Sequence, residues 1–140
     1  MVVHGSLSPD SIVVAKDKHL RIRNYQDARF FGKREEHNII FSAEERTFTD
    51  SELNFIAPEI LEENLISPAA DYWSLGCIIY FMLSGKKPFE EKKREDTAYS
   101  ILMNNCDIIA LPVSIEAKDL LIKLMQLVVE MRLGSGPSGS

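Results

Sequence analysis

Residues 67–85 read SPAADYWSLGCIIYFMLSG, and this stretch decides the fold of the 140-residue chain. A helix over residues 69–83 would carry apolar side chains on nearly every side, which is typical of a helix at the centre of a domain. Pro68 suits the first turn of a helix, where its missing N–H is no loss. Gly85 ends the pattern, and Pro88 prevents it from resuming. We therefore expect a buried central helix.

Two further helices are expected on the C-terminal side. Residues 115–128 place apolar side chains at amphipathic spacing, and Ser114 is a suitable N-cap. A shorter helix is expected over residues 95–103. On the N-terminal side, the β-prone runs Ile12–Val14 and Leu20–Ile22 predict a hairpin.

Residues 27–54 show no regular pattern, so we expect a long and mostly irregular loop there. Taken with the predicted helices and hairpin, this gives an α+β fold class that is mainly α, with a short β-hairpin and a buried central helix.

Composition excludes several classes of protein. Hydrophobic residues make up 45% of the chain, which is too many for a disordered protein. The longest apolar block, residues 77–83, is far shorter than the ~20 residues of a membrane span. The net charge of −5 argues against nucleic acid as a partner. Cys77 and Cys106 have no metal-ligand spacing and indicate a reducing intracellular compartment, the cytoplasm or the nucleus.

A set of short motifs follows the order and spacing found in eukaryotic protein kinases, and the chain resembles the large lobe of that family. The sequence HGSLSPDS, residues 4–11, is similar to the catalytic-loop motif HRDLxxxN. The other matching motifs are APE (57–59), DYWSLG (71–76), LSG and PF (83–85 and 88–89), EAKDLL (116–121) and MRLG (131–134). The phrase RLGSGP, residues 132–137, most resembles the branch related to protein kinases A, G and C, especially its ribosomal-protein kinases.

The resemblance implies a partial protein-kinase-like domain over residues 1–136 and a truncated tail over 137–140. It begins at the catalytic loop. The small lobe, with its glycine-rich loop and strand lysine, is therefore expected to be absent from these residues.

The resemblance also places neutral side chains where the family carries its catalytic groups. The degenerate positions are Ser6 for the catalytic aspartate, Ser8 for the loop lysine, Ser11 for the metal-binding asparagine and Asn24 for the metal-binding aspartate. A serine hydroxyl does not titrate near neutral pH, and loss of a general base costs roughly 10²–10⁴-fold in rate. Mg²⁺ prefers anionic oxygens. We therefore expect no intact catalytic residue and no metal site.

Two carboxylates offer alternatives at these positions. Asp27 would replace the metal ligand, but it lies three residues late and breaks the spacing to the hairpin. Asp10 would replace the base, but it aligns with a position where kinases often carry glutamate, which indicates a role in local loop structure.

Several structural positions of the family are kept. They are His4, Tyr25, Glu59, Asp71, Trp73 and Arg132. The resemblance implies a buried ion pair between Glu59 and Arg132, hydrogen bonds from the catalytic-loop backbone to Asp71, and a ring contact between His4 and Tyr25. Trp73 is expected in the core.

From these residues we predict a catalytically inactive serine/threonine-protein-kinase-like module that binds or regulates a protein partner, such as an active kinase, and is not an enzyme. No cofactor is predicted. ATP and Mg²⁺ would bind only under an alternative, a serine/threonine kinase of unusual mechanism whose small lobe lies outside this chain. A third alternative is a non-functional remnant or splice fragment. We expect no nucleic-acid or membrane partner, and uncovered lobe surface predicts self-association.

Overall fold

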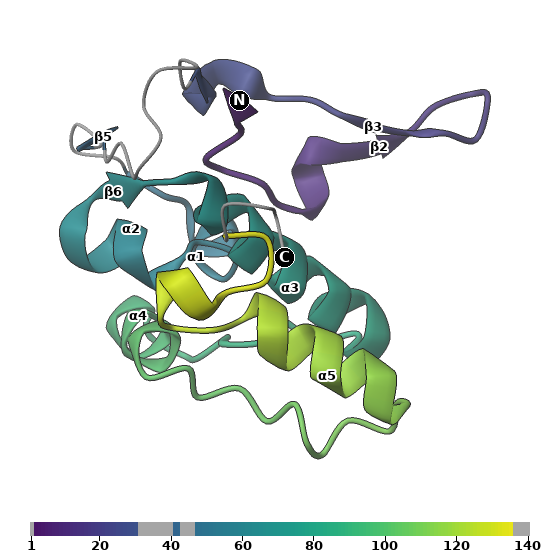
Figure 1. Cartoon of the computed structure of the whole chain (residues 1–140), viewed down its shortest axis with the longest axis vertical. Helices are drawn as coiled ribbons and strands as arrows, with labels where there is room; N and C mark the ends of the chain where they lie inside the picture. Colours follow the sequence, from purple (N-terminus) through teal and green to yellow (C-terminus); the bar gives the residue numbers. More distant parts are fainter. Residues whose placement is uncertain (1, 31–40, 43–46, 136–140) are drawn as a thin grey trace.

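The computed structural model describes residues 2–30, 41–42 and 47–135 of the chain. The α-helices lie together, and a two-stranded hairpin projects to one side (Figure 1). The described residues form the helices α1 (Asp50–Leu53), α2 (Pro58–Glu63), α3 (Pro68–Ser84), α4 (Arg94–Leu102) and α5 (Ile115–Leu124). They also form the short 3-10 turns η1 (Pro9–Ser11), η2 (Tyr25–Asp27) and η3 (Val129–Met131). The mainly α fold class predicted from the sequence is confirmed.

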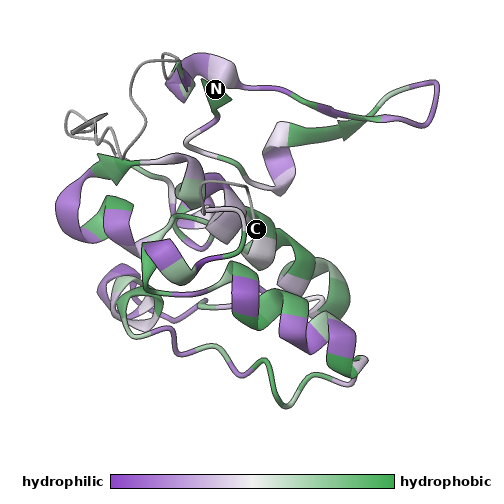
Figure 2. Ribbon diagram, viewed as in Figure 1, coloured by the Kyte–Doolittle hydropathy of each residue, from purple (hydrophilic) through white to green (hydrophobic). Residues whose placement is uncertain are grey.

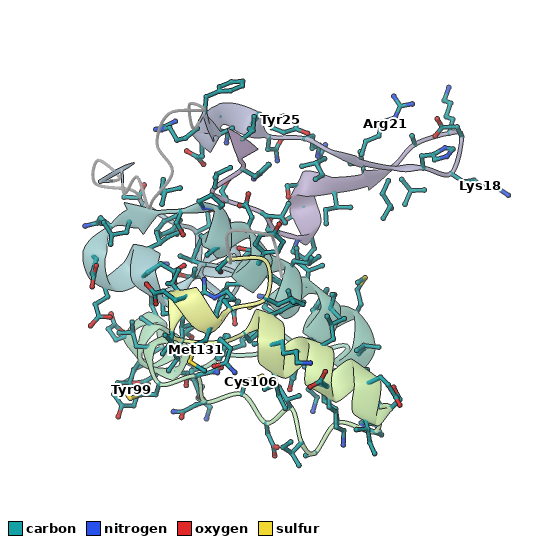
Figure 3. All side chains as sticks on the ribbon, viewed as in Figure 1. Lys18, Arg21, Tyr25, Tyr99, Cys106 and Met131 are labelled. Atoms are coloured by element: carbon teal, nitrogen blue, oxygen red, sulfur yellow. The ribbon has the colours of Figure 1, made fainter. Side chains whose placement is uncertain are left out.

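The strands of the described residues pair antiparallel as separate two-stranded ribbons. The pairs are β1 (Val2–Val3) with β4 (Arg29–Phe30), β2 (Ile12–Val14) with β3 (Leu20–Ile22), and β5 (Phe41–Ser42) with β6 (Leu65–Ile66). The β2–β3 hairpin has the bounds predicted from the sequence, with Ile12 opposite Ile22. Lys18 at the tip of the hairpin and Arg21 on β3 point away from the helices (Figure 3).

The expected irregular loop over residues 27–54 is more structured than the sequence indicated. It contains β4, β5 and α1, while residues 31–40 and 43–46 lie outside the described residues. Two-residue strands carry too little alternation to be found from the sequence. Their partners, β1 and β6, are also remote in the chain.

Helix α3 lies at the centre of the fold, and its ribbon is largely hydrophobic (Figure 2). Its buried residues are Ala69, Ala70, Trp73, Ser74, Gly76, Cys77 and Ile78. The sequence predicted that α3 would be buried on every side. One side is instead exposed, because Leu75, Met82 and Leu83 face solvent. Their exposed fractions are 37%, 69% and 42%, respectively.

The ends of α3 follow from local chemistry. Ser67 precedes the helix, and Pro68 occupies its first turn, as predicted. Gly85 takes the left-handed conformation with φ 71°, and its N–H donates to the Phe81 carbonyl at 2.8 Å. Glycine adopts this conformation without the steric cost that a Cβ would add.

Helix α5 begins as predicted and ends four residues early. The Ser114 hydroxyl accepts from the Ala117 N–H at 3.2 Å, which caps the first turn. At the other end, the Met125 carbonyl accepts from the Asn104 side-chain amide at 2.9 Å. The Lys123 carbonyl accepts from the Leu133 N–H, also at 2.9 Å. Groups from outside the helix thus take over carbonyls that a longer helix would have used.

One main hydrophobic core joins α3 to the helices around it. Trp73 is fully buried and stacks on Phe89, with ring centroids 5.8 Å apart and planes 7° apart. Gly76 lets α3 approach α5 closely, because a Cβ there would lie 2.7 Å from Met125 Cγ. Cys77 is buried and free, and burial raises its pKa well above the ordinary value. Burial likewise raises the pKa of the Cys106 thiol to about 11.

Among the helices of the described residues, none combines the length and apolar character needed to cross a membrane.

Candidate active site

The segment at residues 4–11 is held by a carboxylate on the central helix. Asp71, in the first turn of α3, accepts the His4 N–H through Oδ2 at 2.7 Å and the Gly5 N–H through Oδ1 at 2.9 Å. Gly5 has φ 77°, in the left-handed region that glycine favours. Burial raises the pKa of Asp71 above its ordinary value, although the two backbone hydrogen bonds act in the opposite direction. The carboxylate therefore fixes the backbone at the start of the candidate catalytic loop.

Two of the three serines at degenerate positions close a turn. The Ser8 N–H donates to Ser11 Oγ at 3.0 Å, and the Ser11 hydroxyl donates to the Ser8 carbonyl at 2.7 Å. Both residues are buried, whereas Ser6 is half-buried and its N–H donates to His4 Nδ1 at 3.4 Å. Two serines three residues apart, one before the turn and one at its end, are the sequence signal for this hydrogen-bonded turn. The predictions above did not include it.

The hairpin is tied to the same loop. His4 Nε2 lies 2.8 Å from the Arg23 carbonyl oxygen, and the His4 and Tyr25 rings meet with centroids 5.3 Å apart and planes 59° apart. Arg23 also donates from Nε to the Asp10 carbonyl at 3.0 Å. Tyr25 lies where the chain leaves the hairpin (Figure 3). The structure thus contains the ring contact between His4 and Tyr25 that the resemblance implied.

A buried ion pair joins α2 to the segment after η3. Arg132 donates from Nη1 to Glu59 Oε1 at 2.6 Å and from Nη2 to Oε2 at 3.0 Å. It also donates to the carbonyls of Ala69 at 3.0 Å and Gln126 at 2.9 Å. The Arg132 side chain is 0% exposed and that of Glu59 11%. The guanidinium lies 5.2 Å from the centre of the Trp73 ring. This is the pair that the resemblance implied.

Helix α1 carries a cap that our sequence analysis missed. Thr49 Oγ1 accepts from the Glu52 N–H at 3.2 Å, and Glu52 Oε2 accepts from the Thr49 N–H at 2.9 Å. A threonine followed three residues later by glutamate was the signal. Asp50 of the same helix pairs with Arg94 at 2.6 Å, which ties α1 to α4.

The residues at the expected metal positions do not fit Mg²⁺. The Ser11 hydroxyl is used within its own turn and is buried. Asn24 is exposed and offers only a neutral amide oxygen, whereas Mg²⁺ prefers anionic ligands. Asp27 lies half-buried at the end of η2, and Asp10 is exposed on η1. The described residues contain no group of three or more His, Cys, Asp or Glu side chains that could hold a metal ion.

Comparison with known proteins identifies the relatives of this chain. The protein kinase domain family matches residues 1–136. A probable serine/threonine-protein kinase of Dictyostelium discoideum is 31% identical over 96% of this chain and 24% of its own length. A protein of Caenorhabditis elegans named as a ribosomal protein S6 kinase alpha-1 is 31% identical over 99% of the chain and 16% of its own length. The human RAC-beta serine/threonine-protein kinase is 34% identical over 98% of the chain and 27% of its own length.

The chain therefore spans roughly a quarter or less of the length of these relatives. Their names confirm the predicted relation to the branch that includes the ribosomal-protein kinases.

One prediction is wrong by the same comparisons. Ser6, Ser8, Ser11 and Asn24 led us to expect an inactive module that is not an enzyme. The relatives are instead named as serine/threonine kinases, which points to an enzyme, and nothing in the comparisons indicates an inactive member. The prediction of inactivity rested on the side-chain chemistry of four positions. The family match, in contrast, extends over residues 1–136. The chain belongs to the protein kinase domain family.

Proposed function

We propose that this chain forms part of the large lobe of a serine/threonine protein kinase that transfers the γ-phosphoryl group of ATP to a protein hydroxyl. The small lobe would be supplied by protein residues outside this chain. The observation that carries the proposal is the carboxylate of Asp71 on the backbone N–H groups of His4 and Gly5, within a chain that matches the kinase family over residues 1–136. This arrangement keeps the candidate catalytic loop on the central helix.

Phosphoryl transfer depends mostly on positioning and on neutralising charge, so a held loop is the first requirement. In the proposed step the substrate oxygen bonds to the γ-phosphorus, the bond to ADP breaks, and the hydroxyl proton passes to water. Ser6 can orient the substrate hydroxyl by a hydrogen bond but does not take its proton near neutral pH. The proposed mechanism is therefore unusual, and the rate is expected to lack the roughly 10²–10⁴-fold contribution of a general base. No step is assigned to Mg²⁺, because Ser11 and Asn24 do not fit it.

The experiment is a phosphotransfer assay on the natural full-length protein with radiolabelled ATP and a serine-containing substrate protein. We expect slow transfer by the unaltered protein, which Asp71→Asn lowers because one backbone N–H then faces an amide NH₂ group. Ser6→Asp is expected to raise the rate by up to about 10²-fold, since it supplies a base.

The matched control is Ser6→Asn, which has nearly the same shape as the aspartate variant and cannot accept the proton. It should leave the rate near that of the unaltered protein. The proposal fails if neither the unaltered protein nor Ser6→Asp transfers phosphate while both remain folded.

A further inference from the structure

A concave site lies apart from the candidate catalytic loop, at the corner where α2, the end of α4 and η3 come together (Figure 1). Its cavity has a volume of about 410 Å³. We call it the α2–α4 groove and define it by its apolar residues Leu102, Leu127 and Val129 and its acidic residues Glu62, Glu63 and Glu130. Pockets that hold ligands typically start at about 300 Å³, so the groove is large enough to take side chains of a partner.

The three carboxylates of the groove have no cationic partner within the described ranges, and all three residues are exposed. A fourth glutamate in the wall, Glu59, differs because Arg132 neutralises it. Glu62 and Glu63 lie in the last turn of α2, which contains no basic residue. A helix C-terminus favours cations over carboxylates, so the helix itself gains nothing from these two side chains. The groove therefore presents negative charge that intramolecular contacts do not use.

The rest of the lining is largely apolar and includes one unsatisfied polar group. Leu127 is 41% exposed and contributes apolar surface to the groove. Ser67 also lines the groove, and its hydroxyl oxygen is shielded from solvent with no hydrogen-bond partner in the described part of the chain.

We propose that the α2–α4 groove binds a peptide segment of a partner protein in which arginine or lysine residues flank apolar ones. The cationic groups would pair with Glu62, Glu63 and Glu130, and the apolar side chains would lie on Leu102, Leu127 and Val129. Arginine suits such a site because its guanidinium binds carboxylates in a bidentate way, while its stem packs on apolar surface. The same carboxylates repel the phosphates of nucleic acids and anionic lipids.

Docking at this groove is independent of the proposed phosphotransfer. It uses none of the residues at positions 4–11 and requires neither ATP nor a reaction.

The test is fluorescence anisotropy with the full chain and a labelled probe peptide, Gly-Arg-Leu-Leu-Arg-Gly. We expect saturable binding whose affinity falls at least about tenfold between about 50 and 500 mM NaCl, because salt screens exposed charges. A Gly-Glu-Leu-Leu-Glu-Gly peptide should not bind, because its charges match those of the groove. A Gly-Arg-Ser-Ser-Arg-Gly peptide should bind more weakly, because it cannot cover the apolar residues.

The informative variant combines Glu62→Lys with Glu63→Lys and should weaken binding at least about tenfold. Its matched control combines Glu95→Lys with Asp96→Lys, an adjacent exposed acidic pair on α4 that changes the net charge equally and lies outside the groove. The control should bind within about twofold of the unaltered chain. Glu62→Gln with Glu63→Gln removes charge without reversing it and replaces the lysine variant if that variant misfolds.

Three results would overturn the proposal. One is no saturable binding of the arginine peptide, and another is equal loss in the groove variant and the α4 control. The third is self-association of the chain that the groove variant abolishes, because the occupant would then be a second copy. None of these results depends on whether the protein transfers phosphate.

Discussion

Single residues show how burial turns ordinary contacts into strong constraints. Arg132 is fully buried and uses its guanidinium for two bonds to Glu59 and two to backbone carbonyls. The exposed pair of Lys123 and Asp119 makes a single contact of similar length, 2.7 Å, and lies in water. Exposed ion pairs contribute at most about 1 kcal/mol, whereas removal of one partner of a buried pair typically costs about 3–5 kcal/mol.

Glu59→Gln should therefore lower the free energy of unfolding by about 3 kcal/mol, because it leaves the Arg132 charge buried without a counter-charge. Urea denaturation of the protein followed by circular dichroism measures this change. The control is Asp119→Asn, which should change the free energy by less than about 1 kcal/mol. Equal effects of the two substitutions would mean that the buried pair adds nothing beyond a surface contact.

The residue scale also shows what the sequence could not supply. Asp71, Glu59 and Arg132 make the contacts that the family resemblance implied, because their roles follow from motifs with fixed spacing. Ser8 and Ser11 appeared in the sequence only as missing catalytic groups, yet they close a turn with each other. A substitution reveals which chemistry a side chain lacks, but the contacts that it gains depend on the folded backbone.

At the scale of elements, boundaries set by neighbouring residues could be predicted from the sequence. Boundaries set by residues remote in the sequence could not. The β2–β3 hairpin and the two ends of α3 follow from nearby residues, and the structure agrees with their predicted positions. The early end of α5 depends on Asn104 and Leu133, which come from other parts of the chain. The β1–β4 pair likewise joins residues far apart in the sequence, so periodicity could not reveal it.

Contact between α3 and α5 gives a prediction at this scale. Gly76→Ala would place a Cβ 2.7 Å from Met125 Cγ and 3.0 Å from Leu124 Cβ, so these side chains or the two helices must shift apart. Overpacking of this kind costs about 1–3 kcal/mol, which exceeds the gain of up to about 1 kcal/mol from the better helix propensity of alanine. We expect a lower midpoint of urea denaturation.

The control for this substitution is Met82→Ala on the exposed side of α3, which should change stability by less than about 0.5 kcal/mol. An unchanged midpoint in Gly76→Ala would show that α5 shifts without loss of packing.

At the scale of the whole molecule, large apolar side chains remain exposed on several elements. They include Val14 and Leu20 on the hairpin, Met82 on α3 and Ile115 on α5. Exposed apolar surface of this kind marks either contact with another part of a protein or a tendency to associate. The relatives are about four or more times longer than this chain.

The 140-residue chain expressed alone should therefore self-associate. Sedimentation velocity should show a sedimentation coefficient that rises with protein concentration. This association should persist at high salt, because apolar contacts are not screened, whereas peptide binding in the α2–α4 groove should weaken. A single monomeric species at all concentrations would contradict the prediction.

The stacked arrangement of Trp73 gives this lobe an optical reporter of its own. Trp73 is the single tryptophan of the chain, has no solvent exposure, and contacts both Phe89 and the Arg132 guanidinium. Its fluorescence should appear at short wavelengths and resist quenching by iodide while the Glu59–Arg132 pair is intact. Loss of that pair should shift the Trp73 emission maximum to longer wavelength. Intrinsic tryptophan fluorescence therefore reports whether the buried ion pair is intact, without an added label.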